Sequence, residues 1–414
     1  MRDFLPAEKA QRERILSVIR ASYRAHGFDE IETPVVEDSD RLHAGLGGDN
    51  EKLAYAVMKR GLTPEDLHAA ADPLDLADLG LRFDLTVPLA RFYASHRAEL
   101  PTVFRAIQIA PVWRAERPQK GRYRQFVQCD IDIIGESGPI AEVELITATA
   151  AALSALGLDG CVIRINDRRL LTSTLTILGF VPEEFDPVLI TVDKLDKVGQ
   201  TGVIAELRER GVTSAAVDAL EVFFARPAEG ASVFGEAAIG ALMPEGVDAA
   251  AVAELARIGE AVNEVLGAQV VQFDPWLVRG MGYYTGAIFE VAHPSLGYSL
   301  GGGGRYDGMI GRFLGTDVPA AGFSLGFERL VDLVELPESG STDAAALVHD
   351  ADVPLAALAA LQSALVATGR RVRLERRPRN IAPLLAQLEA SGFAEFAYVT
   401  AGSTVDSLEF RPLG

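Results

Sequence analysis

Residues 104–134 contain arginines and carboxylates at spacings that could bind an anion beside a cation. An arginine guanidinium can bind a phosphate or carboxylate through two parallel hydrogen bonds. The polar residues share one parity on the two arms of an expected β-hairpin: Gln108, Arg114, Glu116, Arg122, Arg124, Gln128, Asp130 and Asp132. Because side chains alternate faces along a strand, we expect all of them on one face. A solvated outer face is the alternative, but the two arms contain no Lys, Thr or Ser.

Two residues of a second segment, Asp84 and Thr86, could bind an ammonium group. They share a parity, so they would point together from a strand. A cap at the end of that strand is the alternative interpretation, and the segment alone does not separate the two.

Glycines stand beside an arginine and tyrosines in residues 277–286 and 301–308: Arg279, Tyr283, Tyr284 and Tyr306. Glycine lets the backbone approach a ligand closely. The run Gly301 to Gly304 fits neither a P-loop nor a dinucleotide fingerprint. A tight turn is the alternative, and the neighbouring arginine and tyrosines favour a binding site.

Arg329 stands in the first turn of a helix expected near residues 322–330. The helix dipole favours acids at that end. An anion bound at the helix N-terminus would explain the arginine.

The composition allows a large core and excludes several classes of protein. The chain has 414 residues, of which 49% are hydrophobic, and a formal charge of −19. The acidic balance argues against a general nucleic-acid coat protein, although residues 105–124 form a basic island. Cys129 and Cys161 are the only cysteines and have no metal-ligand spacing, so we expect no protein metal site and a reducing, cytoplasmic location. The sequence shows no signal peptide and no membrane span.

Hydrophobic periodicity predicts an α+β chain with three parts. Helices are expected at residues 6–24, 141–156 and 168–178, and strands near 30–34, 162–165, 270–273, 283–292 and 298–300. Residues 180–262 are rich in Ala, Glu and Leu and are predicted to be a helical insertion. Residues 344–414 read as a small separate α/β domain.

These segments together resemble the class II aminoacyl-tRNA synthetases, and specifically the histidyl-tRNA synthetase family. RAERPQKGRYRQF (114–126) is similar to the family's motif 2, and GFSLGFERL (322–330) to its motif 3. LVRGMGYYTG (277–286) and GGGGRYDG (301–308) resemble its two histidine-specific motifs. LRFDLTVPLARF (81–92) and DKLDKVG (193–199) resemble the branch that includes eukaryotic enzymes. The likeness covers nearly all of residues 1–335.

The resemblance implies a class II catalytic domain on an antiparallel sheet, formed by residues 1–179 and 263–336. Residues 180–262 would be its helical insertion and residues 344–414 a short anticodon-binding-like domain. The implied protein is a histidine–tRNA ligase, an ATP-dependent enzyme acting on histidine, ATP and tRNA, with Mg²⁺ on the ATP. A homodimer joined near residues 32–37 and 84–92 is also implied.

The resemblance further implies roles for individual residues. Arg114 and Arg279 would contact the α-phosphate as the catalytic pair, and Glu116, Arg122 and Arg329 would bind other parts of ATP. The remaining matches would bind histidine: Asp84, Thr86, Gln128, Asp132, Tyr283, Tyr284 and Tyr306. Residues 117–122, at the hairpin tip, could meet the tRNA acceptor end.

Two departures and one rival accompany this resemblance. The family usually has Asp where this chain has Gly282, and the C-terminal domain is short, with seven arginines and eight acids over residues 341–414. The rival is the regulatory subunit of ATP phosphoribosyltransferase, a paralogue that binds histidine without aminoacylation. That subunit typically loses the ATP-binding arginines, whereas this chain keeps Arg114, Arg279 and Arg329. A ligase using another carrier is a further alternative.

Overall fold

The computed structural model describes residues 1–46, 53–117, 123–225, 234–279, 282–336 and 343–413. The chain divides into two compact units, residues 1–2 with 14–335 and residues 3–13 with 336–414. The architecture is α+β, as the sequence predicts. Among the described residues, no helix is long and apolar enough to cross a membrane.

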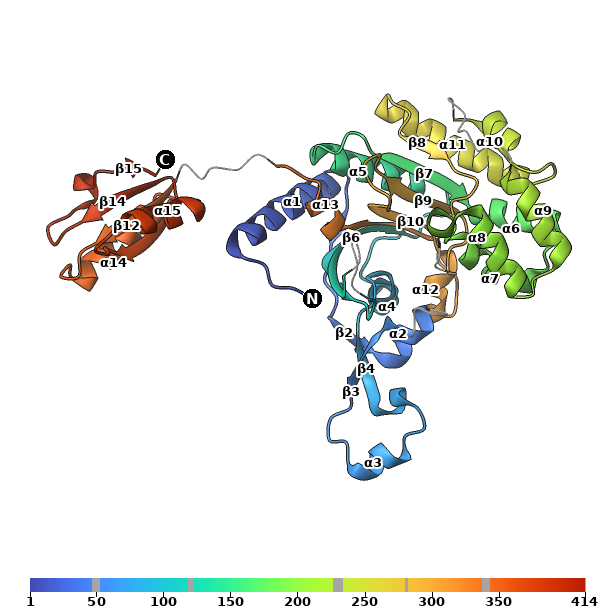
Figure 1. Cartoon of the computed structure of the whole chain (residues 1–414), viewed down its shortest axis with the longest axis horizontal. Helices are drawn as coiled ribbons and strands as arrows, with labels where there is room; N and C mark the ends of the chain where they lie inside the picture. Colours follow the sequence, from blue (N-terminus) through green and yellow to red (C-terminus); the bar gives the residue numbers. More distant parts are fainter. Residues whose placement is uncertain (47–52, 118–122, 226–233, 280–281, 337–342, 414) are drawn as a thin grey trace. The chain divides into compact units, whose positions relative to one another are not determined.

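An eight-stranded sheet forms the centre of the first unit (Figure 1). Its outer pairs, at the two edges, are parallel and its six inner strands are antiparallel. The strand order is β1 (Asp29–Glu30), β5 (Phe104–Trp113), β6 (Gln125–Ile134), β11 (Ala320–Gly326), β10 (Gly301–Arg305), β9 (Ala287–Ala292), β7 (Val162–Asp167) and β8 (Val271–Phe273). The hairpin of β5 and β6 confirms the sequence prediction for residues 104–134.

The apolar face of this sheet is covered by helices. Helix α5 (Ile140–Ala155) packs on β6 and β11, and α11 (Ala249–Leu266) packs on α5, β7 and β8. Cys129, Ile131 and Ile133 of β6 are fully buried, and each such isoleucine stabilises the fold by roughly 1.5–3 kcal/mol. Helix α1 (Pro6–Ala25) adds Ile15, Ile19 and Tyr23 to the core.

The glycine run forms a strand in the middle of the sheet. Residues 301–305 make β10, which pairs with β9 on one side and β11 on the other. The strand expected near residues 298–300 therefore lies over residues 301–305 instead, and the alternative of a tight turn at the glycine run is wrong. Glycine has low strand propensity, but continuous ladders on both sides satisfy this backbone.

The opposite face of the sheet is flanked by shorter elements. Helices α4 (Thr86–His96) and α12 (Asp307–Leu314) pack on each other, and α12 also contacts β11. Helix α13 (Phe327–Val331) follows β11 directly. These elements leave open the region above the polar residues of β6.

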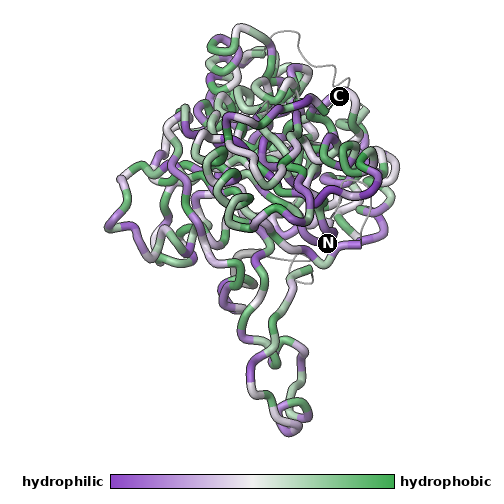
Figure 2. The backbone as a smooth tube through the Cα atoms, turned by 90° about the vertical axis from the view of Figure 1, so that its left-hand side faces the viewer, coloured by the Kyte–Doolittle hydropathy of each residue, from purple (hydrophilic) through white to green (hydrophobic). Residues whose placement is uncertain are grey.

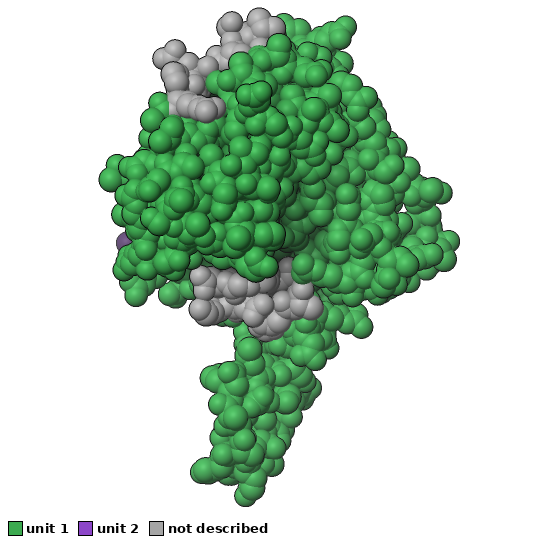
Figure 3. Space-filling view, turned by 90° about the vertical axis from the view of Figure 1, so that its right-hand side faces the viewer, with its two compact units in different colours: residues 1–2, 14–335 green, residues 3–13, 336–414 purple. Residues whose placement is uncertain are grey.

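A three-stranded sheet extends from this unit as an arm. It has the order β2 (Val36–Asp38), β4 (Ala77–Leu81) and β3 (Tyr55–Met58), and α2 (Ser39–Leu46) follows β2. Helix α3 (Pro64–Ala69) and a 3-10 helix (Pro73–Leu76) lie between β3 and β4. Figures 2 and 3 show the arm as a narrow projection from the body of the unit.

Residues 168–266 are helical throughout their described parts. The helices are α6 (Arg168–Leu178), α7 (Pro182–Val192), α8 (Leu195–Glu209), α9 (Ser214–Phe224), α10 (Glu236–Leu242) and α11. Trp276, which follows β8, packs its ring between Phe223 and Phe224 of α9, at 4.5 and 4.7 Å between centroids. This aromatic contact joins the helices to the sheet.

The second unit contains its own four-stranded sheet. The order is β13 (Arg371–Arg376), β12 (Ala344–His349), β14 (Glu395–Val399) and β15 (Arg411–Pro412). Alternate residues of β12 enter two apolar clusters, one with Leu388 of α15 (Ala382–Ala390) and one with Leu361 of α14 (Leu355–Val366). This unit therefore has a core of its own.

A buried ion pair joins β10 to α5. Arg305 donates from Nε and Nη2 to the two carboxylate oxygens of Glu142, at 2.6 and 2.8 Å. Two backbone carbonyls, of Glu136 and Gly138, accept further hydrogen bonds from the same guanidinium. The Glu142 side chain is 2% exposed, so removing it would leave the buried Arg305 with only Asp307, 3.3 Å away and 36% exposed, as a carboxylate partner among the described residues.

We expect Glu142→Ala to lower the free energy of unfolding by about 3–5 kcal/mol, the usual cost of breaking a buried pair. Glu144→Ala is a matched control on the same helix, because Glu144 binds Arg105 with two hydrogen bonds but is 30% exposed. The control should cost about 1 kcal/mol or less. Urea unfolding of both variants measures the difference, and equal losses would contradict the argument.

Candidate active site

Polar residues of β6 lie along one face of the sheet, opposite small residues of β11. In the antiparallel register, Gln128 pairs with Gly326, Asp130 with Ser324 and Asp132 with Gly322. The odd-numbered residues between them, Cys129 and Ile131, point to the other face of the sheet and are buried. One face of the sheet is therefore apolar and the other displays an amide and two carboxylates.

Two glycines on this face make room for functional side chains. A Cβ atom at Gly322 would lie 1.9 Å from Oδ1 of Asp132. A Cβ atom at Gly302 would lie 2.7 Å from the guanidinium carbon of Arg279. A larger residue at either position would have to displace the side chain above it.

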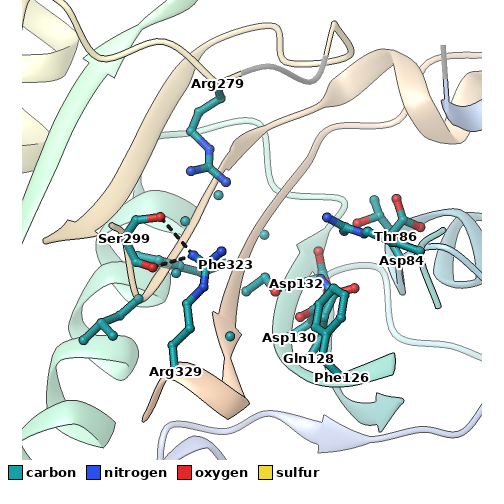
Figure 4. A pocket seen from close by; sticks show the side chains of 18 of the residues that line it. Asp84, Thr86, Phe126, Gln128, Asp130, Asp132, Arg279, Ser299, Phe323 and Arg329 are labelled. Atoms are coloured by element: carbon teal, nitrogen blue, oxygen red, sulfur yellow. Dashed lines mark hydrogen bonds between the residues drawn. The ribbon is translucent and has the colours of Figure 1, made fainter. Parts of the chain in front are cut away.

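A cavity of about 300 Å³ lies over this face. The structure places every site residue predicted from the sequence on its wall, except Arg122, which lies outside the described residues. The wall includes Asp84, Thr86, Arg114, Glu116, Gln128, Asp132, Arg279, Tyr283, Tyr284, Tyr306 and Arg329. Figure 4 shows Arg279 and Arg329 reaching toward each other, with the Asp130 and Asp132 side chains to one side.

Each of the three pocket arginines donates a hydrogen bond to a different residue of the chain. Arg279 donates from Nη1 to Oε2 of Glu290 at 2.7 Å. Arg329 donates to the carbonyl oxygen of Ser299 at 2.5 Å, and the dashed lines of Figure 4 mark its contacts with Ser299. Arg114 donates from Nε to the carbonyl of Phe83 at 3.2 Å.

Arg114 also lies over aromatic faces. Its guanidinium is 4.3 Å from the centroid of the Phe83 ring and 5.1 Å from that of Phe126. Burial lowers its pKa, although the charges of Asp84 and Glu116 oppose that shift. Its hydrogen-bond and ring partners are thus neutral, two carboxylates lie nearby, and an anion in the pocket would be an additional partner.

Asp84 lies in the turn before α4, so the expectation that it points from a strand together with Thr86 is wrong. Strand β4 ends at Leu81, and Thr86 is the first residue of α4. Oδ1 of Asp84 accepts the Val87 amide at 3.1 Å, which caps the helix. Oδ2 is buried and has no hydrogen-bond partner among the described residues. The alternative of a cap therefore describes Oδ1 of Asp84, and the interpretation as a ligand-binding group describes Oδ2.

Hydrogen bonds from Arg82 and Gln108 hold the turn that contains Asp84. Arg82 donates to the carbonyls of Thr33 and Pro111, each at 2.8 Å. Gln108 donates to the Leu85 carbonyl at 2.9 Å. Gln108 therefore supports the turn and does not appear on the pocket wall.

Asp132 forms a short contact with a tyrosine. The hydroxyl of Tyr306 donates to Oδ1 of Asp132 at 2.5 Å. Burial raises the pKa of Asp132 to about 7, and this hydrogen bond opposes the shift. Burial and the charge of Asp132 raise the pKa of Tyr306, so its hydroxyl remains a donor. Tyr283 lies beside Tyr284 and Tyr306, at 4.8 and 6.1 Å between ring centroids.

Several pocket residues were not predicted as site residues. Asp130 shares the parity of Gln128 and Asp132, which was a usable signal, and burial raises its pKa well above the ordinary value. Ser324 accepts from Nε2 of Gln128 at 2.9 Å. Phe126 of β6 shares the parity of Gln128 as well. The other wall residues had no such signal: Tyr123, Ser299, Leu300, Phe323 and Glu328.

The expected helix-terminal anion site around Arg329 is not supported by its helix. Helix α13 has five residues, too few for a substantial dipole. Its first turn instead holds Glu328, whose Oε2 accepts the Val127 amide at 2.8 Å. Arg329 faces the pocket from the side wall.

The arrangement can bind a ligand with two chemically different ends. Arginines Arg114, Arg279 and Arg329 suit an anionic group, and Asp84, Gln128, Asp130 and Asp132 suit donors and cations. Among the described residues, no cluster of three His, Cys, Asp or Glu could hold a metal ion.

Comparisons with known proteins agree with this geometry. The family model described as histidyl-tRNA synthetase matches residues 1–330. A histidine–tRNA ligase of Leifsonia xyli subsp. xyli is 60% identical over 418 residues, covering 100% of this chain and 97% of that protein. A probable histidine–tRNA ligase of Tropheryma whipplei is 42% identical, covering 99% and 96%.

Two solved structures share the fold. A histidyl-tRNA synthetase from Nostoc sp. PCC 7120 has a TM-score of 0.75 at 24% identity, covering 100% of this chain and 93% of that chain. A Bacillus halodurans protein, described as an ATP phosphoribosyltransferase regulatory subunit/histidyl-tRNA synthetase, has a TM-score of 0.76 at 22% identity, covering 98% and 97%. At these identities the likeness shows the fold alone.

We expect Asp132→Asn to become progressively more stable than the parent protein as pH rises from about 4 to 7. The folded protein keeps the Asp132 proton to about pH 7, whereas an ordinary Asp loses it near 3.8. Unfolding therefore releases a proton in this window, and the stability of the parent protein falls as pH rises. Asn cannot ionise and can still accept the Tyr306 hydroxyl.

The gain should reach roughly 4 kcal/mol at most and become constant above pH 7. Urea unfolding at a series of pH values measures it. A stability difference that does not change with pH would show that Asp132 ionises normally in the folded protein.

Proposed function

The chain belongs to the histidyl-tRNA synthetase family, and from this membership we propose that it activates histidine with ATP and transfers it to tRNA. It is an ATP-dependent aminoacyl-tRNA ligase of class II. The 60% identity to a histidine–tRNA ligase over the whole chain supports this function. The regulatory-subunit alternative is not favoured, because the relatives that match over almost their full length are named as ligases.

The observation that carries the proposal is one pocket whose wall contains three arginines, Arg114, Arg279 and Arg329, as well as the carboxylates of Asp84, Asp130 and Asp132. ATP would lie against the arginines, with Arg114 and Arg279 at the α-phosphate. Arg329 would contact the γ-phosphate and adenine side, and Glu116 the adenine amine. Arg122 would also contact ATP. Arginine is the residue type that binds phosphate through two parallel hydrogen bonds.

Histidine would lie against the carboxylates of the same pocket. Asp84 Oδ2, Thr86 and Gln128 would bind its α-ammonium group. Asp132 would bind an N–H of the imidazole, with its orientation fixed by Tyr306. The aromatic residues Tyr283 and Tyr284 would enclose the ring. The buried position of Asp84 Oδ2, without a partner among the described residues, supports an ammonium ligand there.

The reaction has two displacement steps. A histidine carboxylate oxygen bonds to the α-phosphorus of ATP, and the bond from that phosphorus to the bridging oxygen breaks, releasing pyrophosphate. A hydroxyl of the tRNA 3′ end then attacks the adenylate carbonyl and releases AMP. No protein nucleophile is required, so catalysis depends on positioning and on stabilising the negative charge that develops. Arg114 and Arg279 would provide that stabilisation.

We also propose Mg²⁺ on the ATP phosphates, where it would neutralise negative charge. Mg²⁺ is usually bound through substrate phosphates with one or two carboxylates, and Glu328 offers a carboxylate on the pocket wall. A cytoplasmic homodimer joined near residues 32–37 and 84–92 is part of the same proposal. So is the division into a catalytic domain (1–179 and 263–336), an insertion (180–262) and an anticodon-binding-like domain (344–414).

The family usually has Asp where this chain has Gly282, and this difference is compatible with the proposed function. Gly282 is exposed, and no described atom lies within 4 Å of a Cβ atom built there. A side chain at this position would therefore have open space around its Cβ atom. We therefore propose that the missing carboxylate does not prevent histidine binding.

The first test is histidine-dependent exchange of labelled pyrophosphate into ATP, followed by charging of tRNA. We expect exchange by the unmodified protein, and a loss of about 10²- to 10³-fold in kcat for Arg279→Ala, because the variant lacks a preorganised donor for developing charge. Arg312→Ala, which changes an exposed arginine of α12 away from the pocket wall, should keep kcat within about twofold.

The outcomes separate the candidate functions. No exchange at saturating histidine would overturn the ligase proposal and favour a histidine-binding regulatory protein. Exchange without charging of any tRNA would favour a ligase with another carrier. Near-normal exchange by Arg279→Ala would refute the role of that arginine alone.

A further inference from the structure

Arg164 of β7 lies outside the pocket wall but is connected to it through the sheet. In the strand register Arg164 pairs with Glu290 of β9, and Glu290 pairs with Gly302 of β10. The Arg279 guanidinium lies over Gly302, because a Cβ atom there would contact its carbon at 2.7 Å. Arg164, Glu290 and Arg279 therefore follow one another across the same face of the sheet.

The two oxygens of Glu290 bind two different arginines. Oε2 accepts from Nη1 of Arg279 at 2.7 Å, and Oε1 accepts from Nη2 of Arg164. Arg164 is itself fixed by Asp274, which follows β8 and accepts from Nη1 at 3.1 Å. In this arrangement Glu290 gives one oxygen to Arg279 and the other to Arg164.

We propose that Arg164 is a positioning residue for the reaction: by binding Oε1 of Glu290 it holds that carboxylate in the orientation in which Oε2 binds Arg279. Arg–carboxylate pairs favour the two-bond fork geometry when the carboxylate is free to turn. The single bond to Glu290, together with the contact to Tyr284, sets where the Arg279 guanidinium lies on the pocket wall. Its Nε is buried and has no hydrogen-bond partner among the described residues.

Burial makes these contacts stronger than surface ion pairs. The side chains of Glu290, Asp274 and Arg164 are 13%, 18% and 26% exposed. Burial opposes the charge of Arg164, but the negative charges of Glu290 and Asp274 outweigh it and raise its pKa. Arg164 is therefore a permanent cation, and Glu290 is always shared.

Two acids near the junction of α7 and α8 add to this network: Asp193, which follows α7, and Asp196 in the first turn of α8. Asp196 accepts from Nη2 of Arg164 at 3.2 Å but is 70% exposed, so its contribution is small. Burial opposes the charge of Arg279, and the neighbouring Tyr284, Glu290 and Asp193 together raise its pKa. Asp193 therefore influences Arg279 through its charge.

The inference rests on the proposed function, because its measurement is pyrophosphate exchange. We expect Arg164→Met to lower kcat about tenfold while the KM for histidine changes less than about threefold, since Arg279 would act on the transition state at the phosphate. Arg164→Lys can still bind one Glu290 oxygen, so its kcat should lie between those of the parent and Arg164→Met. Thermal unfolding and calorimetric histidine binding show whether each variant is folded.

Arg169→Met is the matched control. Arg169 lies in the first turn of α6, directly after β7. It binds two carboxylates, those of Asp167 and Glu254, away from the pocket wall. Its side chain is 35% exposed, so its loss should affect stability in a similar way. We expect its kcat to stay within about twofold of the parent value.

A double-mutant cycle separates positioning from a general structural effect. If Arg164 acts through Glu290, adding Arg164→Met to Glu290→Gln should lower kcat by less than about twofold. A tenfold loss that persists in the Glu290→Gln background would overturn the proposal, as would Arg164→Met with the kcat of the control. If Arg164→Met does not fold, the same cycle with Arg164→Lys decides. Absence of exchange by the parent protein would instead refute the proposed function.

Discussion

The structure depends on a strip of sheet face that has almost no side chains of its own. Glycines of β10 and β11 leave space above the sheet, and side chains from β6, β9 and the following loops fill it. A glycine strand is intrinsically weak because it loses more backbone entropy on folding. Here both of its edges are paired and the opposite face is closed by α5, so neighbouring strands supply the stability that β10 lacks.

A second constraint follows from the polar side chains that fill this space. Asp84 Oδ2, Gln128 Oε1, Asp130 Oδ1 and Arg279 Nε are buried and have no hydrogen-bond partner among the described residues. Each such atom costs about 1–3 kcal/mol. Burial also raises the pKa values of Asp84, Asp130 and Asp132. A ligand with donors for the three oxygens and an acceptor for Arg279 Nε would remove these costs, whereas a ligand without them would not, and this difference is a source of specificity.

Local patterns in the sequence predicted the parts of the site that depend on one element. The parity of residues 104–134 predicted both faces of the paired part of the β5–β6 hairpin, because alternation is a property of a single strand. Arg114, Glu116 and Arg124 lie outside the two strands, so parity does not place them. The same reasoning was wrong for Asp84 and Thr86, because the chain leaves β4 before them and Asp84 binds an amide of α4. The register of β6 against β11 joins residues nearly 200 positions apart, so Ser324 and Glu328 could not be placed from local spacing. The strand expected near residues 298–300 was displaced, since the glycine strand is stabilised by its neighbours and not by its own residues.

The two catalytic arginine candidates differ in how their charges are balanced. Arg279 is paired with the carboxylate of Glu290, so part of its charge is already compensated. Arg114 is held by a backbone carbonyl and two aromatic rings, and the charges of Asp84 and Glu116 partly oppose the lowering of its pKa by burial. Burial is the largest influence on the pKa of both arginines, so both cations have lost hydration that a bound anion would replace. Because contacts within the chain fix both guanidinium groups before the reaction begins, both suit the stabilisation of charge that appears as the bond to phosphorus forms.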